Sequence, residues 1–245
     1  MGAMAAQTVA DDVRSELVAA IDPAHAGGDI AGVTVGDDIA SLAAAGAEVV
    51  VDFTRLDVAR TNLTWLGEQG MHAVVGTSGF AESDLDELRS AFNSSNCLIA
   101  PNFGIGAVLM MRFAEMASPW FETAEIIELH HDNKVDAPSG TALTTMERME
   151  AAGGEWAPDP TQDETLPGSR GGSLDGTSGR VRVHSVRMRG MLSHQEVVLG
   201  TEGEVLTIRH DATNIESFMP GVMLAVTGVA DLPGVTLGLE ALIDL

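Results

Sequence analysis

The sequence has little cysteine and no long apolar run, and both shortages narrow the class of protein. Cys97 is the only cysteine among 245 residues, which excludes an internal disulfide and a zinc site made of cysteines. No apolar run is long enough to span a membrane. The first basic residue is Arg14, so no basic segment precedes an apolar one as it does in a signal peptide. These features predict a cytoplasmic protein.

Positive charge is also scarce. Lys and Arg together number 13 against 36 Asp and Glu, which gives a formal net charge of −23. Nucleic-acid binding requires a basic surface that faces the phosphates, so we do not expect it. The acidic surface that this charge implies repels anionic ligands at long range. A site for an anion must therefore be built locally, from a few cations and backbone N–H groups.

Lysine occurs once, at Lys134, and all the other cationic residues are arginines. The lysine ammonium is a compact, strongly hydrated point charge whose pKa shifts readily on burial. The single copy lies four residues after His130, in the segment HHDNKVDAPSGT. One explanation is chance in a sequence that avoids lysine. The two neighbouring histidines favour the other explanation, a chemical role that a guanidinium cannot fill.

The first hundred residues alternate between short apolar strands and helical segments. This alternation is typical of a parallel sheet covered on both faces, and crossovers of this length are right-handed. It predicts a doubly wound, Rossmann-like α/β domain that binds a nucleotide. The expected strands are 17–21, 48–52, 72–75 and 97–100, and the expected helices are 3–13, 39–45, 58–69 and 82–92.

The pattern changes at about residue 104, which predicts an inserted α+β domain with a mixed or antiparallel sheet. We expect residues 1–103 and 218–245 to form the dinucleotide-binding domain, and residues 104–217 to form the domain for substrate binding and oligomerisation. The expected elements of the second half are helix 107–117, strand 124–129, a helix from 139, a long loop over 152–180, antiparallel segments 181–189, 196–199 and 205–209, helix 218–229 and an apolar tail over 235–245.

Open α/β sheets bind ligands beyond the carboxyl ends of their strands, and three strand ends here carry suitable residues. Asp22 can accept hydrogen bonds from the hydroxyls of a ribose. The turn Gly76–Gly79 lets the backbone approach a flat ring or a ribose, because glycine lacks a Cβ. Ala100–Phe103 forms a rigid turn into the second domain. Each feature alone also fits an ordinary strand-to-helix turn, but together on one edge they favour a dinucleotide site.

The two histidines at the end of strand 124–129 raise the question of a metal. Adjacent residues of a strand point to opposite faces of the sheet, so His130 and His131 are poorly placed to share one ion. No thiol lies nearby, and no clear spacing of metal ligands is present. We therefore expect no metal.

The segment after these histidines resembles the start of a helix. Ser139 is the expected cap, and Gly140 and Thr141 would offer the N–H groups of the first turn. Such a helix end binds a carboxylate or a phosphate, and Lys134 can reach the same point with charge-assisted hydrogen bonds. Together with His130, the segment combines a proton donor, a cation and an anion cradle. The alternative is an exposed polar loop with a routine helix cap.

These residues support a family resemblance. The run HHxxKxDxPSGTA at residues 130–142 resembles the signature of the 4-hydroxy-tetrahydrodipicolinate reductases, the dihydrodipicolinate reductases of bacterial lysine biosynthesis. The motifs occur in the family's order over nearly the whole chain, and their character is actinobacterial. The other similar motifs are VDFT at 51–54, GTSGF at 76–80, APNF at 100–103, GTEGE at 200–204 and FMPG at 218–221.

The resemblance implies an activity. The family reduces a cyclic dicarboxylate imine with NADH or NADPH and yields tetrahydrodipicolinate for diaminopimelate and lysine. His130 matches the family's proton donor, and Lys134 matches its second catalytic cation. The residues implied to hold a substrate carboxylate are His131, Ser139, Gly140 and Thr141.

The resemblance also implies a cofactor site and an assembly. The family is usually a homotetramer that assembles through the sheet of the second domain. Asp22 is followed by Pro23 and not by an arginine that could bind a 2′-phosphate, which favours NADH without excluding NADPH. The residues implied to bind the cofactor are Met1, Gly2, Asp22, Gly76, Thr77, Ser78, Ala100, Pro101, Asn102 and Phe103.

The beginning of the sequence departs from the family pattern. The family starts with a strand and a loop of the form Gly-x-x-Gly-Arg-Met-Gly, and this sequence starts Met-Gly-Ala-Met, so that Gly2 matches the last glycine of the loop. A missing central strand would open a gap of about 9.6 Å in the sheet, two strand spacings. We therefore expect Met1 to be a misassigned start codon.

Two other functions remain open on the sequence. The chain could be a catalytically silent remnant that binds a dicarboxylate but cannot hold a dinucleotide. It could also be another dehydrogenase with two domains, such as one that acts on diaminopimelate, although the segment HHDNK argues against this. Titration with NADH separates the reductase from the remnant, because the remnant predicts no saturable binding.

Overall fold

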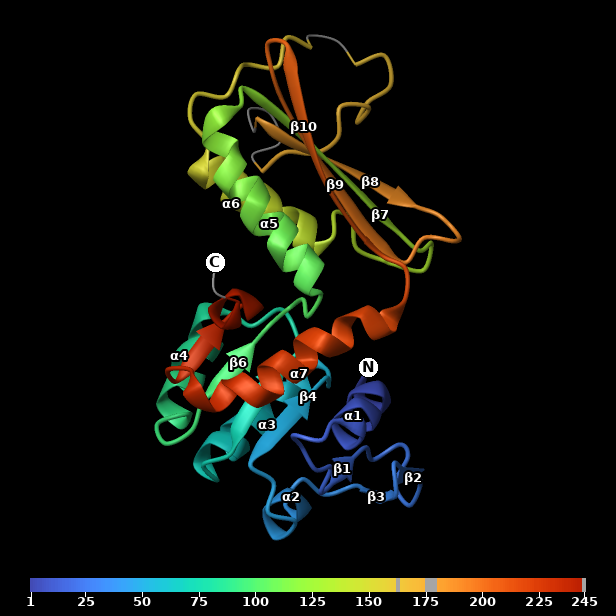
Figure 1. Ribbon diagram of the computed structural model, residues 1–245, viewed down its shortest axis with the longest axis vertical. Helices are drawn as coiled ribbons and strands as arrows, with labels where there is room; N and C mark the ends of the chain where they lie inside the picture. The colour runs from blue at the N-terminus through green and yellow to red at the C-terminus, as the bar shows by residue number, and fades with distance from the viewer. Residues whose placement is uncertain (162–163, 175–179, 244–245) are drawn as a thin grey trace. The chain divides into compact units, whose positions relative to one another are not determined.

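The computed structural model describes residues 1–161, 164–174 and 180–243 (Figure 1). It divides into two compact units, Met1–Phe103 with Phe218–Leu245 and Gly104–Ser217. Parts of the predicted loop over 152–180, and the last two residues of the predicted apolar tail, lie outside the described residues. None of the helices in the described ranges combines the length and apolarity that a membrane crossing requires.

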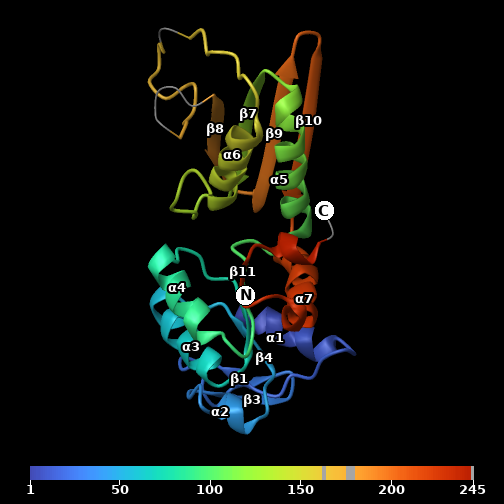
Figure 2. The ribbon, with the colours of Figure 1, turned by 90° about the vertical axis from the view of Figure 1, so that its left-hand side faces the viewer.

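Unit 1 contains a parallel sheet with the strand order β11-β6-β5-β4, so the predicted α/β class is confirmed. Its strands are apolar because both faces of the sheet are covered. Helices α3 and α4 lie on one face and α7 on the other (Figure 2). The bounds are β4 (Val49–Asp52), α3 (Leu56–Glu68), β5 (His72–Val75), α4 (Glu82–Ala91), β6 (Cys97–Ile99), α7 (Met219–Gly228) and β11 (Val235–Leu237).

The core of this sheet is a cluster of leucines from the two helices packed on small strand residues. Leu63 and Leu66 of α3 are fully buried, and Leu85 and Leu88 of α4 join them. Gly67 of α3 lies directly against α4, because a Cβ there would be 2.9 Å from the backbone of Ala91. The close approach of α3 to α4 therefore requires glycine at this point.

A second, smaller sheet of unit 1 has the order β1-β3-β2. The predicted strand 17–21 is reduced to two residues, and the strands β2 and β3 were not predicted at all. They form a tight hairpin around Ala31 and Gly32, which both have positive φ. Strands this short carry too little alternation to be read from sequence. The bounds are α1 (Gly2–Asp11), β1 (Ala20–Ile21), β2 (Asp29–Ile30), β3 (Val33–Gly36) and α2 (Ser41–Ala44).

The two sheets of unit 1 do not join. A doubly wound sheet places its first strand between the strands that correspond to β1 and β4. Among the described residues, no strand occupies that position, and β4 pairs only with β5. A cavity of about 1390 Å³ lies there instead, lined by residues of both strands and of α1. The backbone edges of β1 and β4 therefore border the same cavity.

Unit 2 is a four-stranded sheet in the order β10-β9-β7-β8, with α5 and α6 on one face (Figures 1 and 2). The sheet is mixed, because β8 runs parallel to β7 and the other pairs are antiparallel. The expected antiparallel pairing of segment 181–189 was therefore wrong. Parallel strands need a crossover that returns the chain to the end of the sheet where the first strand began. Helix α6 and the long loop form this crossover between β7 and β8. The bounds are α5 (Ile105–Ala117), β7 (Thr123–His130), α6 (Gly140–Ala152), β8 (Val181–Arg187), β9 (Ser193–Thr201) and β10 (Glu204–Ala212).

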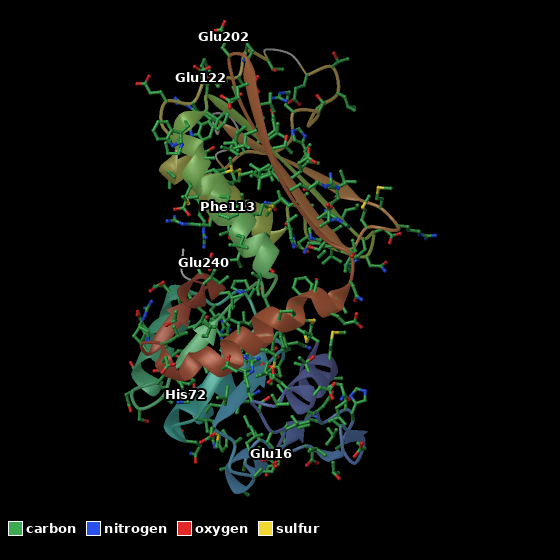
Figure 3. All side chains as sticks on the ribbon, viewed as in Figure 1. Glu16, His72, Phe113, Glu122, Glu202 and Glu240 are labelled. Atoms are coloured by element: carbon green, nitrogen blue, oxygen red, sulfur yellow. The ribbon has the colours of Figure 1, made fainter. Side chains whose placement is uncertain are left out.

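Alternation along β7 decides which side chains face the helices. Ala124, Ile126 and Glu128 are buried, whereas Glu125 and Ile127, which point the other way, are partly exposed. His130 shares the parity of Glu128 and thus the helix side of the sheet. At the opposite end of the sheet, Glu202 lies in the turn between β9 and β10 (Figure 3).

Candidate active site

His130 is the last residue of the central strand β7. The register places it directly between Arg187 of β8 and Ser193 of β9. Its Nδ1 atom forms a short hydrogen bond with the Glu128 carboxylate, and its Nε2 atom lies 3.1 Å from the Ser193 hydroxyl. Both ring nitrogens therefore have defined partners, and the ring is held in one orientation.

Glu128 was not identified from the sequence, although it is the best-connected side chain of the site. It is completely buried, and Arg187 donates to its two oxygens at 2.9 and 2.8 Å. The backbone N–H of Ser139 donates to the same carboxylate at 3.2 Å. A buried charge is tolerated only where it is paired and hydrogen-bonded, as it is here. The signal in the sequence was an acidic residue at a core position of the strand.

Burial raises the pKa of the Glu128 carboxyl, but hydrogen bonds from His130, Arg187 and Ser185 lower it further, from 4.5 to about 2. At 1.36 kcal/mol per pKa unit this shift corresponds to about 3 kcal/mol of stability. Because the folded-state pKa is the lower one, the contribution is complete above about pH 4.5 and is lost as the pH falls toward 2. Urea unfolding from pH 6 to pH 2 measures this loss. A Glu128→Gln variant should lack this part of the pH dependence, and an unchanged profile would contradict the assignment.

The first turn of α6 is the segment for which the sequence predicted an anion cradle, and the cradle stays a prediction. Ser139 is the helix cap, as expected, because its hydroxyl accepts the N–H of Ala142 at 3.2 Å. Gly140 is the first helical residue and is exposed, with open space where a Cβ would be. The first turn holds no acidic residue of its own, and the anion already at this helix end is the Glu128 carboxylate, which accepts the N–H of the cap residue Ser139.

Lys134 lies in the loop between β7 and α6. Its Nζ atom is 2.8 Å from Asp136, and the side chain is 23% exposed. The hydrogen bond from Lys134 lowers the pKa of the Asp136 carboxyl. Arg187 also donates to the Asp136 carbonyl oxygen at 2.6 Å, so the same arginine holds both Glu128 and the lysine loop. His131 follows the strand and is partly buried, and its carbonyl oxygen accepts the N–H of Lys134.

Within the described parts of the chain, no group of three or more His, Cys, Asp or Glu is arranged to hold a metal ion. Cys97 is buried in unit 1, and burial raises the pKa of its thiol to about 12. The thiol is thus protonated and inert near neutral pH.

The carboxyl ends of three parallel strands of unit 1 meet at one edge. Asp52, Val75 and Ile99 are in register, so the turns that start at Phe53, Gly76 and Ala100 lie side by side. The structure thereby brings the predicted segments 76–78 and 100–103 together. Thr77 is fixed by a hydrogen bond from its hydroxyl to the Thr54 carbonyl oxygen at 2.7 Å.

Packing inside unit 1 explains the glycine at position 76. A Cβ there would lie 2.2 Å from the ring of Phe53. That ring makes an edge-on contact with Phe103, with the centroids 5.7 Å apart. The nearest neighbour of Gly76 is therefore an aromatic side chain of the same unit. The predicted contact of this glycine with a cofactor stays a prediction.

Asp22 and Gly2 lie elsewhere in unit 1, on the wall of the large cavity. The Asp22 carboxylate accepts the N–H of Ala24 at 2.9 Å and pairs with His25 Nδ1 at 2.7 Å. The hydrogen bond with His25 is the main reason why the pKa of Asp22 is lowered. The Asp22 side chain is half exposed, and sequence reasoning had not identified His25. Met1 is the cap position of α1, which begins at Gly2.

The two units define a class of protein. Unit 1 is a doubly wound dinucleotide-type domain, and unit 2 holds a histidine, a lysine and the capped N-terminus of α6. This combination is that of a dinucleotide-dependent oxidoreductase with two domains.

Comparisons with known proteins give the family. Residues 1–103 match the description "Dihydrodipicolinate reductase, N-terminus" and residues 106–243 match "Dihydrodipicolinate reductase, C-terminus". The chain belongs to the dihydrodipicolinate reductase family.

Individual relatives agree over most of the sequence. The chain is 58% identical over 206 residues to the 4-hydroxy-tetrahydrodipicolinate reductase of Thermobifida fusca, which covers 81% of this chain and 82% of the relative. It is 50% identical to the enzyme of the same name from Nocardia farcinica, over 98% and 92% of the two chains. The solved structure of dipicolinate-bound dihydrodipicolinate reductase from Paenisporosarcina sp. TG-14 matches with a TM-score of 0.83 and 36% identity, over 97% of this chain and 93% of that one.

Proposed function

We propose that the chain reduces 4-hydroxy-tetrahydrodipicolinate to tetrahydrodipicolinate with NADH or NADPH. The reaction replaces the ring hydroxyl with hydrogen, so it consumes a hydride and a proton and releases water. The observation that supports the proposal most strongly is the set of contacts around Glu128. His130, the cap residue of α6 and Arg187 all bind this one buried carboxylate, so a proton donor and an anion cradle are held at fixed positions.

The residues of unit 2 have two roles toward the substrate, carboxylate binding and proton donation. One carboxylate of the dicarboxylate would accept the N–H groups at the start of α6 and the ammonium of Lys134, with His131, Ser139 and Thr141 as further ligands. His130 would donate the proton from Nε2, because Nδ1 is committed to Glu128. Lys134 would exchange its ion pair with Asp136 for a contact with the substrate. These local cations offset the overall charge of −23.

A dinucleotide fits the residues of unit 1. When bound, the nicotinamide supplies the hydride. The N-terminus of α1 has open space beside Gly2 and no acidic residue in its first turn, which suits a pyrophosphate. Asp22 lies on the same cavity wall and is exposed enough to bind ribose hydroxyls. The remaining proposed cofactor ligands are Met1, Gly76, Thr77, Ser78, Ala100, Pro101, Asn102 and Phe103.

Assembly and compartment form the last part of the proposal. We infer a cytoplasmic homotetramer in which copies meet through the sheet of unit 2. Helices α5 and α6 cover one face of that sheet (Figure 2), so the opposite face is the one available to a second copy. Light scattering of the purified chain tests this arrangement. A molar mass of one chain at micromolar concentration would rule it out.

A coupled measurement tests the activity. Adding 4-hydroxy-tetrahydrodipicolinate to the chain and NADH should lower the NADH absorbance, and NADH alone should bind with a saturable isotherm. The silent remnant predicts neither result. Substitution of NADPH in the same assay determines the cofactor preference.

Gly140 provides a test of the anion cradle that separates binding from stability. A Gly140→Asp variant adds an anion to the first turn of α6, which should stabilise the helix by about 0.3–1 kcal/mol. The same charge should weaken binding of the dicarboxylate at least about tenfold by repulsion. The matched variant Gly140→Ala adds only a methyl group and should weaken binding much less. Isothermal calorimetry with dipicolinate measures the affinity of each variant. Equal affinities of the two variants would contradict the cradle.

A further inference from the structure

Three strands of unit 2 present a row of polar side chains across the sheet. His130 is at the centre, Arg187 is beside it on β8, and Ser193 is beside it on β9. Glu128 lies two residues before His130 on β7, and therefore on the same face of the sheet, and it forms hydrogen bonds with both His130 and Arg187. We propose that Glu128 is a positioning residue that keeps a proton on His130 Nδ1 and thereby makes Nε2 the atom that exchanges protons. The proposal rests on the proposed function for the reaction that this proton serves.

The chemistry of a carboxylate fixes the direction of the first hydrogen bond. An ionised carboxylate has only acceptor sites. Arg187 donates to both of its oxygens and the Ser139 N–H donates to one of them, so the surroundings favour the charged form. The partner of Glu128 on the imidazole must therefore be the donor. In neutral His130 the single ring proton lies on Nδ1, and Nε2 carries the lone pair.

Ser193 suits both protonation states of the histidine. A hydroxyl can donate a hydrogen bond or accept one, and the Ser193 Oγ atom is 3.1 Å from Nε2. It can donate to the lone pair of neutral His130 and accept from Nε2–H of the protonated ring. A proton can thus arrive at Nε2 and leave it without movement of the ring.

Arg187 prevents the carboxylate from turning away. Its two terminal nitrogens bind the two oxygens of Glu128 separately, at 2.9 and 2.8 Å, which fixes the plane of the carboxylate. One of them also binds the Asp136 carbonyl oxygen. The oxygen aimed at His130 is therefore set by contacts that do not involve the histidine itself. This preorganisation is what separates a positioning residue from an incidental neighbour.

The position of the proton can be measured directly. The ¹⁵N chemical shifts of the two ring nitrogens of His130, assigned with a His130→Asn variant, distinguish a protonated from an unprotonated nitrogen. In the unmodified protein we expect the neutral ring to carry its proton on Nδ1. A neutral ring protonated on Nε2 would overturn the proposal, whether or not any variant folds. The measurement needs no catalysis, so it is independent of the proposed function.

Glu128→Gln tests the role of the charge. Arg187 donates to both oxygens of Glu128, so the NH₂ group of glutamine faces an Arg187 N–H in either orientation. The negative charge and the fixed plane are both lost, and the preference for a proton on Nδ1 should be lost with them. The value of kcat should fall about 100-fold or more, while the KM for the dicarboxylate should change by less than about threefold. Glu128→Asp, which keeps the charge, should recover part of kcat and the proton on Nδ1.

Glu125→Gln is a matched control on the same strand. Glu125 also binds a histidine and an arginine, His184 at 2.7 Å and Arg170 at 2.6 Å, but on the opposite face of the sheet. The Glu125→Gln substitution should leave kcat within about twofold of the parent value and the ring proton of His130 on Nδ1. A Glu128→Gln protein that keeps both the Nδ1 proton and the parent kcat would refute the positioning role. A proton on Nδ1 in a protein without reductase activity would instead refute only the proposed function.

Discussion

Replacement of His130 by asparagine is expected to lower kcat by about 10²–10⁴, the usual contribution of a positioned proton donor. Asparagine keeps a polar side chain at the end of β7 but cannot transfer a proton from the position of Nε2. The affinity for NADH should not change, since the proposed cofactor residues all belong to unit 1. Stopped-flow kinetics with saturating cofactor measure the reduction step itself.

His184→Asn is the control for this experiment. His184 lies on the neighbouring strand β8 and also pairs with a glutamate, Glu125. It shares the chemistry of His130 but not its place beside the start of α6. An equal loss of kcat in both variants would mean that the effect comes from the stability of the sheet and not from the proton donor.

Removal of the only lysine should affect both binding and turnover. Lys134→Ala takes away the ammonium that would contact the substrate carboxylate, and we expect kcat/KM to fall by about 10²–10³. Lys134→Arg restores the positive charge, but on a planar guanidinium instead of a compact ammonium. The recovery of kcat/KM should therefore be incomplete. Steady-state kinetics over a range of dicarboxylate concentrations separate the effects on KM and kcat.

Arg189→Ala is the control for this experiment, because it removes one positive charge, as Lys134→Ala does. Arg189 pairs with Asp132 at 2.9 Å at the same end of the sheet, and its side chain is 93% exposed. Surface pairs of this kind contribute little to stability. A loss of kcat/KM as large as that of Lys134→Ala would show that long-range charge, not a local contact, is responsible.

Local chemistry in the sequence was sufficient for part of the site. The segment Pro-Ser-Gly-Thr predicted a helix start. In the structure the Ser139 hydroxyl accepts the N–H of Ala142 and so caps α6. The apolar strands 72–75 and 97–100 predicted neighbouring turns, and Gly76 and Ala100 do follow strands that are in register. These features depend on residues close together in the chain, where propensity and spacing are informative.

The missed features depend on contacts between distant residues. Arg187 reaches Glu128 across 59 positions and Ser193 reaches His130 across 63, so only the strand register brings them together. The buried position of Glu128 was readable from alternation along 123–130, but its partners were not. The parallel direction of β8 was missed for the same reason, because it follows from the path of the chain through α6 and the long loop.

In the proposed site, the start of α6 and Lys134 hold a carboxylate of the substrate beside His130. A crystal structure of the chain with dipicolinate tests it most directly. We expect one carboxylate within hydrogen-bond distance of the Gly140 N–H and of Lys134 Nζ, with the ring against His130 Nε2. Dipicolinate bound away from this helix end, with Lys134 still paired to Asp136, would contradict it.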